Sequence, residues 1–285
     1  MYIINNNIHI RPNIQTPKSS QIIVMNDANF LTGIDIGVPL NIFSNIFTNL
    51  HYGYDITTGR TIAIQFLLGY YTYGRDRYSD ALEYIATPDR YNTTKQELYR
   101  FIYKNRDGYN ITLSLSFIAI LYILLTSIDT QQDILYNLPF IPLFYINGKY
   151  KSFKPLLREF KAVYIGVMWC LASLVLPCVF YEHNYDIFLS PQDYIPCILT
   201  LSATSNFADN KDIAEDRANN IDTIPVKYGI ERSNVISFLA LSISSILLIE
   251  NPNFVNRIWI NGIFVLQNFA TIALIYNNTF SNTFF

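Results

Sequence analysis

The chain has 285 residues, of which 51% are hydrophobic and only 15% are charged. Soluble domains usually carry about a quarter charged residues, so this composition favours a protein surrounded by lipid. The formal net charge of −2 argues against the concentrated basic face that binds nucleic acid. The three cysteines lie within apolar runs, which indicates ordinary packing and no disulfide framework or zinc-ligand spacing.

Residues 1–20 are rich in Asn, Ile and Pro, and they lack the continuous apolar segment of a signal peptide. We therefore expect a loose N-terminal arm over residues 1–30, followed by one membrane domain over residues 31–285. Eight runs in that domain contain no Asp, Glu, Lys or Arg, and four of them approach or exceed the roughly 18 residues of a membrane-spanning helix. In chain order the runs cover residues 36–50, 61–73, 111–128, 134–147, 162–181, 194–208, 233–249 and 258–285.

The basic residues alternate between the loops that separate these runs. The segments after the second, fourth and sixth runs hold seven, five and four of the 20 basic residues, whereas residues 129–133 and 182–193, after the third and fifth runs, hold none. Because Lys and Arg collect on the cytoplasmic side of membrane proteins, this alternation supports about eight spanning helices. The sequence thus predicts an all-α, polytopic transmembrane helical bundle, which is an integral, multi-pass membrane protein.

The longest segment expected outside the membrane covers residues 81–109. Its Thr-Pro-Asp at positions 87–89 indicates a turn, and Lys-Gln-Glu-Leu at positions 95–98 begins a short amphipathic helix. This segment lies on the basic side of the membrane. We expect it to cap a cavity from the water.

Two groups of aspartates lie at the basic-side ends of predicted spans. Asp76 and Asp80 follow the second run, and because they are four positions apart they share one face of a helix. Asp209, Asp212 and Asp216 follow the sixth run, and their spacing also superposes on one helical face. Five carboxylates are therefore expected to converge.

Such crowding is unfavourable without a cation, because neighbouring like charges suppress ionisation. Magnesium is commonly held by one or two carboxylates together with substrate phosphates, so the two groups predict a site for Mg²⁺ and a phosphate. Basic side chains on the same face are expected to neutralise the remaining phosphate charge. These are Arg75, Arg77, Lys154, Arg158, Lys161, Lys211 and Lys227. The alternative is that all these charges merely solvate helix ends at a membrane interface.

The residues around the second group resemble a known family. Residues 209–229, including Thr-Ile-Pro-Val at positions 223–226, are similar to the second aspartate motif and the following Thr-Leu-Pro-Val stretch of UbiA-type intramembrane prenyltransferases. The first motif of that family is Asn, three residues, Asp, three residues, Asp. Asp76 and Asp80 fit this pattern, whereas Thr72 stands at the Asn position. The match extends loosely from about residue 30 onwards.

The resemblance implies a bundle of eight or nine spans around a central cavity. It also implies magnesium-dependent transfer of a polyprenyl group from an allylic diphosphate to an aromatic or lipid acceptor within the membrane. The catalytic residues that it implies are Asp76, Asp80, Asp212 and Asp216, which with Asp209 are also the implied magnesium ligands. The implied substrate-binding residues are Thr72, Arg77, Lys154, Lys161 and Lys211.

Several alternatives remain open at this point. Lys161 is either a phosphate contact or a lysine whose charge extends to the membrane interface, and a salt bridge is the simplest role for Lys211. For the whole chain, the departure at Thr72 leaves open a non-catalytic, isoprenoid-binding membrane protein of the same fold. A transporter is a third alternative, because intramembrane carboxylates often mark ion pathways. Here, however, the carboxylates gather at helix ends on one side.

Overall fold

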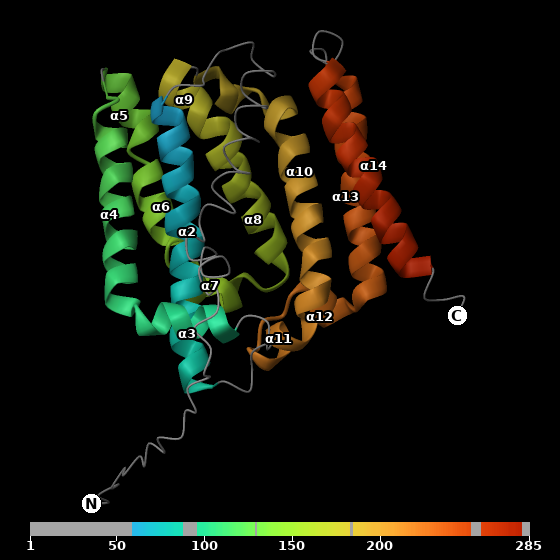
Figure 1. The fold of residues 1–285 in the computed structure, drawn as a ribbon. Coiled ribbons are helices and arrows are strands. Elements are labelled where there is room, and N and C mark those ends of the chain that lie inside the picture. The colour runs from blue at the N-terminus through green and yellow to red at the C-terminus, as the bar shows by residue number, and fades with distance from the viewer. Residues whose placement is uncertain (1–58, 88–95, 129, 183–184, 252–257, 281–285) are drawn as a thin grey trace, which may run out of the picture.

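The computed structural model describes residues 59–87, 96–128, 130–182, 185–251 and 258–280. Within these ranges the chain is helical and contains no strand, as the sequence predicts. The N-terminal arm and the first apolar run, residues 36–50, lie outside the described residues. Figure 1 shows long helices running side by side, with several short helices gathered at one end.

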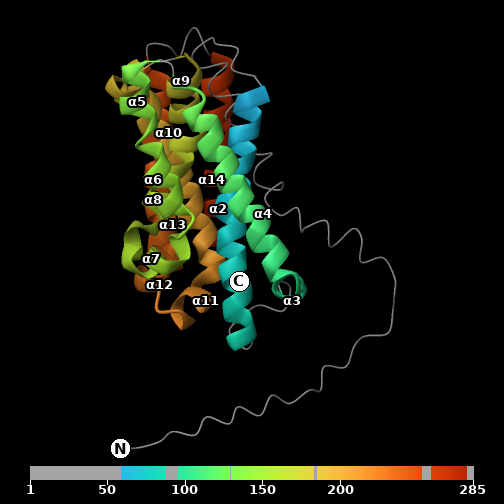
Figure 2. The same ribbon diagram turned by 90° about the vertical axis from the view of Figure 1, so that its left-hand side faces the viewer.

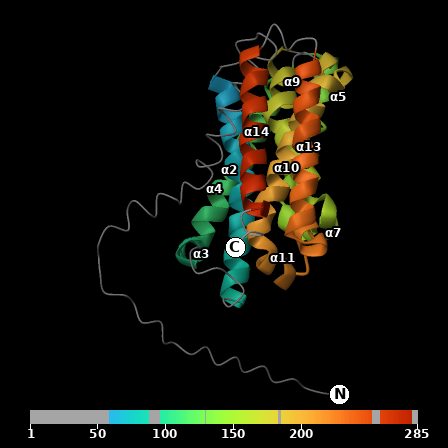
Figure 3. The ribbon, with the colours of Figure 1, turned by 90° about the vertical axis from the view of Figure 1, so that its right-hand side faces the viewer.

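The long helices form one bundle. They are α2 (Gly59–Ala86), α4 (Arg106–Leu125), α8 (Lys161–Cys170), α10 (Pro191–Ala208), α13 (Ile230–Glu250) and α14 (Ile258–Phe280). α8 continues through a π-helical turn, Leu171–Val175, into α9 (Leu176–Glu182). α2 packs against α4, while α8, α10, α13 and α14 pack in sequence. Figures 2 and 3 show the common axis from the sides of α4 and α14.

The predicted runs within the described ranges coincide with helices, with two differences. α2 extends well beyond the run 61–73 and therefore carries Asp76 and Asp80 on its last turns. The run 134–147 forms two short helices, α5 (Gln131–Asn137) and α6 (Phe140–Asn147), with Pro139 at the start of the second. Proline has no backbone N–H and its ring clashes with the preceding turn, which interrupts a single helix. The predicted amphipathic helix is present as α3 (Gln96–Lys104).

Three short helices, α7 (Tyr150–Leu157), α11 (Ile213–Ala218) and α12 (Ile224–Tyr228), lie with α3 at the same end of the bundle (Figure 1). Arg158 has a φ of 49°, a left-handed conformation that few side chains favour. It ends α7, so the chain changes direction before α8 begins.

Among the residues that the structure describes, three stretches are long and apolar enough to cross a membrane: Arg106–Leu125, Tyr150–Val179 and Ile230–Glu250. The second contains the turn at Arg158, so its straight part begins with α8. The length and composition of these stretches support association of the chain with a membrane.

The polarity of α13 is inverted relative to a helix of a soluble protein. Its buried residues include Ser233, Ser237 and Ser244, whereas Val235 and Ile246 are each 54% exposed. A helix in water buries its apolar face. In lipid the surroundings are as apolar as the side chains, so this driving force is absent, and small polar residues are favoured at contacts between helices. The described surface of α13 therefore fits lipid better than water.

Hydrogen bonds between side chains join α10, α13 and α14 in the interior. Thr200 on α10 lies 2.8 Å from the hydroxyl of Ser244 on α13, and it donates to Asn268 on α14 over 3.0 Å. Asn206, one turn and a half further along α10, donates to the hydroxyls of Ser233 and Ser237. All of these groups are buried, so each bond replaces an unpaired polar group that would be costly in an apolar interior.

The approach of α8 to α10 depends on a glycine. A Cβ atom at Gly166 would lie 2.1 Å from the Ser202 hydroxyl and 2.8 Å from the backbone oxygen of Ile198. Backbone atoms in the middle of a packed helix cannot move aside locally. The two helices that bracket the charged end are therefore held at a spacing that only glycine permits.

We expect Gly166→Ala to lower the free energy of unfolding by about 1–3 kcal/mol, because the added methyl overpacks this contact. Gly108→Ala is the matched control, since a Cβ there meets nothing within 4 Å; alanine should leave stability unchanged or raise it by up to about 1 kcal/mol. SDS titration in mixed micelles measures both. Equal stability of the two variants would contradict the proposed close approach.

Candidate functional site

Both aspartate groups lie at the end of the bundle that carries the short helices. Asp76 and Asp80 occupy the C-terminal half of α2, and Asp209 and Asp212 form the 3-10 turn that follows α10. Asp216 lies on the next helix, α11. The segments that carry the two groups thus lie at the same end of the bundle (Figure 1).

A buried lysine joins two of the three aspartates of the second group. Lys161, the first residue of α8, places its Nζ 2.7 Å from Asp209 Oδ1 and 3.2 Å from Asp216 Oδ2. Lys154 on α7 reaches the other oxygen of Asp216 at 3.1 Å. Lys161 is only 6% exposed and Asp216 only 1%. The Lys161 charge therefore does not extend to the interface; it bridges two carboxylates inside the protein.

A second lysine of α7 binds the first group. Lys151 forms an ion pair with Asp80 Oδ1 and lies 3.3 Å from Glu83 Oε2. The hydroxyl of Tyr99 on α3 donates to Asp80 Oδ2 over 3.3 Å. α3 and α7 thus both contact the end of α2 through Asp80. The segment expected to cap a cavity contributes one of these contacts.

The carboxyl of Asp76 is surrounded by protein but remains accessible through a cavity. Its pKa is raised to about 6, first because burial disfavours the charged form and second because of the nearby Asp80 charge. The positive charges of Lys151, Lys154 and Lys161 act in the opposite direction. A divalent cation near Asp76 and Asp80 would relieve both unfavourable contributions.

Asp209 also has a raised pKa, because its burial outweighs the opposing effect of Lys161. The Lys161 ammonium opposes this effect and lowers the cost of burying the carboxylate as an ion. Removal of that ammonium would leave Asp209 without an ion-pair partner among the described residues, whereas Asp216 would keep its contact with Lys154. Lys161 thus links the start of α8 to the turn after α10.

The other basic side chains highlighted by the sequence have different environments. Arg75 donates to Asn110 over 2.7 Å and so ties α2 to α4. Arg158 pairs with Asp222 at 3.2 Å, and Lys227 pairs with Glu159. Lys211 is exposed and forms no ion pair with another described residue, so the salt bridge considered for it is not present there. Lys154 and Lys161, two of the seven basic residues, form ion pairs with aspartates of the second group.

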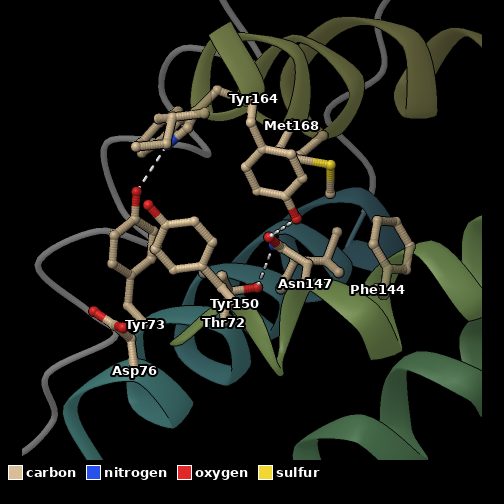
Figure 4. A pocket seen from close by; sticks show the side chains of 13 residues that line it. Thr72, Tyr73, Asp76, Phe144, Asn147, Tyr150, Tyr164 and Met168 are labelled. Atoms are coloured by element: carbon tan, nitrogen blue, oxygen red, sulfur yellow. Dashed lines mark hydrogen bonds between the residues drawn. The ribbon is translucent and has the colours of Figure 1, made fainter. Parts of the chain in front are cut away.

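A cavity of about 100 Å³ borders Asp76 of the first group. Its lining residues are Leu68, Gly69, Thr72, Tyr73, Asp76, Phe144, Asn147, Tyr150, Tyr164, Ile165, Met168, Trp169 and Ala172. Figure 4 shows Asp76 and Tyr73 towards one end and Phe144 towards the other. The cavity therefore combines one charged end with walls that are mainly apolar and aromatic.

Tyr150 lines the cavity together with Asp76. Its hydroxyl is buried and has no hydrogen-bond partner among the described residues, and the charges that act on it include Asp76, Asp209 and Asp216. Its ring stacks on Tyr164, with centroids 5.6 Å apart. A buried hydroxyl that lacks a partner is uncommon in folded proteins. This one is placed to donate to an anionic ligand that approaches the carboxylates.

Sequence reasoning missed Tyr150, Lys151 and Asn147. A signal for Lys151 was available, because Lys151 and Lys154 are three positions apart and share a helical face. Tyr150 and Asn147 carried no such signal, since tyrosines are abundant and asparagines occur throughout the chain. Only the packing of α6 and α7 against α2 and α8 brings them to the cavity.

The described residues contain no group of three or more Asp, Glu, His or Cys side chains close enough to hold one metal ion. The carboxylates instead form two groups, each partly neutralised by lysine. Asp76 and Asp80 still fit magnesium, because Mg²⁺ needs only one or two carboxylates when substrate phosphates and waters complete its shell. The mutual repulsion that raises the pKa of Asp76 is consistent with this fit.

Comparisons with protein-family models, with curated proteins and with solved structures find no match to this chain.

Replacement of Lys161 by methionine should destabilise the protein by about 3 kcal/mol or more, because breaking a buried ion pair leaves an uncompensated charge. Lys227→Met removes an ion pair at the surface and should have a much smaller effect. Thermal unfolding in detergent compares the two variants. A Lys161 variant as stable as the Lys227 variant would show that the bridge contributes little.

The raised pKa of Asp76 predicts a specific pH dependence. Between its ordinary value of 3.8 and about 6, the folded protein binds a proton that the unfolded chain has already lost, so stability should fall as pH rises through this window. Asp76→Asn carries no ionisable carboxyl and should lose this part of the slope. Unfolding midpoints measured from pH 4 to pH 7.5 test it, and parallel profiles for the two proteins would contradict the assignment.

Proposed function

We propose that this chain is a magnesium-dependent prenyltransferase of the UbiA type, acting on a polyprenyl diphosphate and an acceptor within a membrane. The observation that carries the proposal is the arrangement at one end of the bundle. Acidic and basic side chains suited to a metal–diphosphate complex lie directly beside an aromatic cavity. A diphosphate ester with an apolar tail needs both environments at once.

The proposal also assigns the chain to the membrane as an integral, multi-pass protein with eight or nine spans around the cavity. Three helices with the required length and apolarity and the inverted polarity of α13 support this assignment. The alternation of basic residues along the chain supports it independently. With this orientation, the charged end of the bundle would lie at the basic side of the membrane.

Asp76 and Asp80 would hold magnesium from α2, with Asp209, Asp212 and Asp216 facing them from the turn after α10. The bound ion would supply positive charge that stabilises the diphosphate as a leaving group. Asp212 is half-buried and forms no ion pair with another described residue, so in the second group it is the carboxylate most available to the metal. Lys161 would hold the other two aspartates of this group, Asp209 and Asp216, in place.

The basic residues around the carboxylates would bind the diphosphate. Lys154 is able to shift from Asp216 to a phosphate oxygen, and the Tyr150 hydroxyl has an unused hydrogen to donate. These interactions stabilise the charge that develops on the leaving group. In the reaction, the bond between C1 of the prenyl chain and the diphosphate oxygen breaks, and its electron pair leaves with the diphosphate. A bond then forms between C1 and the acceptor, which releases a proton.

The cavity walls would shield the electron-deficient prenyl group from water. Tyr73, Tyr150, Tyr164 and Trp169 line this space, and aromatic faces attract cationic groups. The Trp169 ring is fixed because its Nε1 donates to the Tyr73 hydroxyl over 2.7 Å. Fixed rings stabilise a transient cation without reorganising at the moment of reaction.

Purified protein should release diphosphate from a prenyl diphosphate in the presence of magnesium and an acceptor. Asp76→Ala and Asp212→Ala should each reduce this rate by at least about a hundredfold, because they remove charge that holds the metal complex. Asp107→Ala is the control, since that side chain is 93% exposed on α4 and should retain full activity. Full turnover in both site variants would refute the proposal.

A second candidate is a protein of the same fold that binds an isoprenoid diphosphate without reacting it. It is favoured by the lysines that already contact both oxygens of Asp216, which leaves that carboxylate neutralised without a metal. This function predicts magnesium-dependent binding of a prenyl diphosphate with no release of diphosphate at any acceptor concentration. The same assay with radiolabelled donor separates the two functions.

A further inference from the structure

We propose that Arg100 and Lys104 of α3 and Arg106 of α4 bind the phosphate of an anionic phospholipid, whose acyl chains lie along the outer side of α4. These three residues are called the α3 basic face below. The inference rests on the proposed membrane assignment and not on the proposed reaction. It gives a partner, an anionic lipid headgroup, to a surface that the proposed catalytic site does not use.

α3 carries different chemistry on its two sides. Tyr99 and Ile102 are 2% and 0% exposed and pack against α2 and α4, and the Tyr99 hydroxyl donates to Asp80. Arg100 and Lys104 are exposed, and because they are four positions apart they share one side of the helix. The side of α3 that reaches the aspartates is therefore not the side that carries the basic residues.

The two basic residues of α3 are not neutralised by a neighbouring carboxylate that the structure describes. Arg100 and Lys104 form no ion pair with another described residue. The Arg100 guanidinium instead lies over the ring of Tyr84, 6.0 Å from its centroid, and donates to Gln96 Oε1 over 3.5 Å. Both contacts leave the positive charge in place. The face is thus able to attract an anion.

Arg106 extends the basic face from α3 to the first turn of α4. Its guanidinium lies over the ring of Tyr103, 5.1 Å from the centroid, which connects the two helices. It also lies 3.8 Å from Asp107 Oδ1, but that side chain is 93% exposed, so water weakens the pair. Residues 95–107 contain four basic and two acidic residues. This excess of positive charge occurs in a chain whose net charge is negative.

An apolar stripe on α4 begins just beyond this face. Ile111, Leu115, Ile118 and Tyr122 are 59%, 57%, 59% and 68% exposed, and their spacing of three or four places them on one side of the helix. α4 is long and apolar enough to cross a membrane. The stripe starts five residues after Arg106, a rise of about 8 Å along the helix axis. A phospholipid has the same order, with a charged phosphate above its acyl chains.

The orientation of α3 suits the surface of a membrane. Figure 1 shows α3 lying across the direction of the long helices, and Figures 2 and 3 show it at the outer edge of the bundle, beside the end of α4. Helices that lie in the interface with basic residues on their polar side are attracted to anionic lipids. A free phosphate would gain nothing from the apolar stripe. The occupant is therefore assigned as a lipid.

Native mass spectrometry of the full chain tests this assignment. The protein is released from detergent micelles that contain equal amounts of dioleoyl phosphatidylglycerol, which is anionic, and dioleoyl phosphatidylcholine, which has no net charge. Because the acyl chains are identical, the ratio of the two lipids retained by the protein reports selection by the headgroup. The sample contains neither prenyl diphosphate nor magnesium. We expect the parent chain to retain more phosphatidylglycerol.

Arg100→Gln combined with Lys104→Gln should lower this ratio by about fivefold or more, since each basic residue near an anionic surface contributes about fivefold to binding. Asp107→Asn should raise the ratio, because it removes a negative charge beside the phosphate. The matched control combines Arg217→Gln with Arg232→Gln. These two arginines are exposed on α11 and α13, so the control removes the same charge elsewhere on the bundle and should match the parent.

An unchanged ratio in the α3 double variant, with thermal unfolding showing folded protein, would overturn the inference. An equal loss in the control would do the same, because it would show that charge anywhere on this protein attracts the lipid. Displacement of phosphatidylglycerol by soluble glycerol phosphate would assign the face to a free phosphate and would also count against it. Absence of diphosphate release would refute the enzyme and leave this lipid site untouched.

Discussion

The ammonium group of Lys161 lies between the carboxylates of Asp209 and Asp216 in a part of the protein that water hardly reaches. Removing two negative charges from water is costly, and only a paired positive charge makes it tolerable. This bridge ties the start of α8 to the turn after α10. Gly166 lets the same two helices approach closely. The close approach and the pairing of Lys161 with two anions together set the geometry of the charged end.

Along the rest of the bundle, the buried polar groups are uncharged and the outward-facing side chains are largely apolar. α13 turns serines inwards and apolar side chains outwards, as expected where the surrounding medium is hydrocarbon and interhelical hydrogen bonds are strongly favoured over unpaired groups. The bonds of Thr200 and Asn206 to α13 and α14 belong to the same pattern. Charge is concentrated at one end of the bundle, and polar uncharged groups fill the helix contacts along its length.

The proposed chemistry requires these two environments to meet. Asp76 lies at their boundary: its carboxyl borders the aromatic cavity and its pKa is raised by burial. Tyr150 also lines this cavity, and its buried hydroxyl has no hydrogen-bond partner among the described residues, so it is free to donate to the proposed diphosphate. In this arrangement a diphosphate would bind among charges while its tail and the acceptor remain out of water. A water-filled site would hydrolyse a reactive prenyl cation before transfer.

The sequence by itself determined that the chain is helical, where most helices lie, and that Asp209 follows the end of a helix; Asp76, expected at the end of a span, lies inside α2. These features are local, because charge-free runs and spacings of three or four are properties of neighbouring residues. The tertiary structure decided which charges meet: Lys161 bridges two aspartates about fifty positions away, while Arg75 is bound to α4. It also decided that Asn147 and Tyr150 reach the cavity. Such contacts depend on how α6, α7 and α8 pack against α2, which no local pattern encodes.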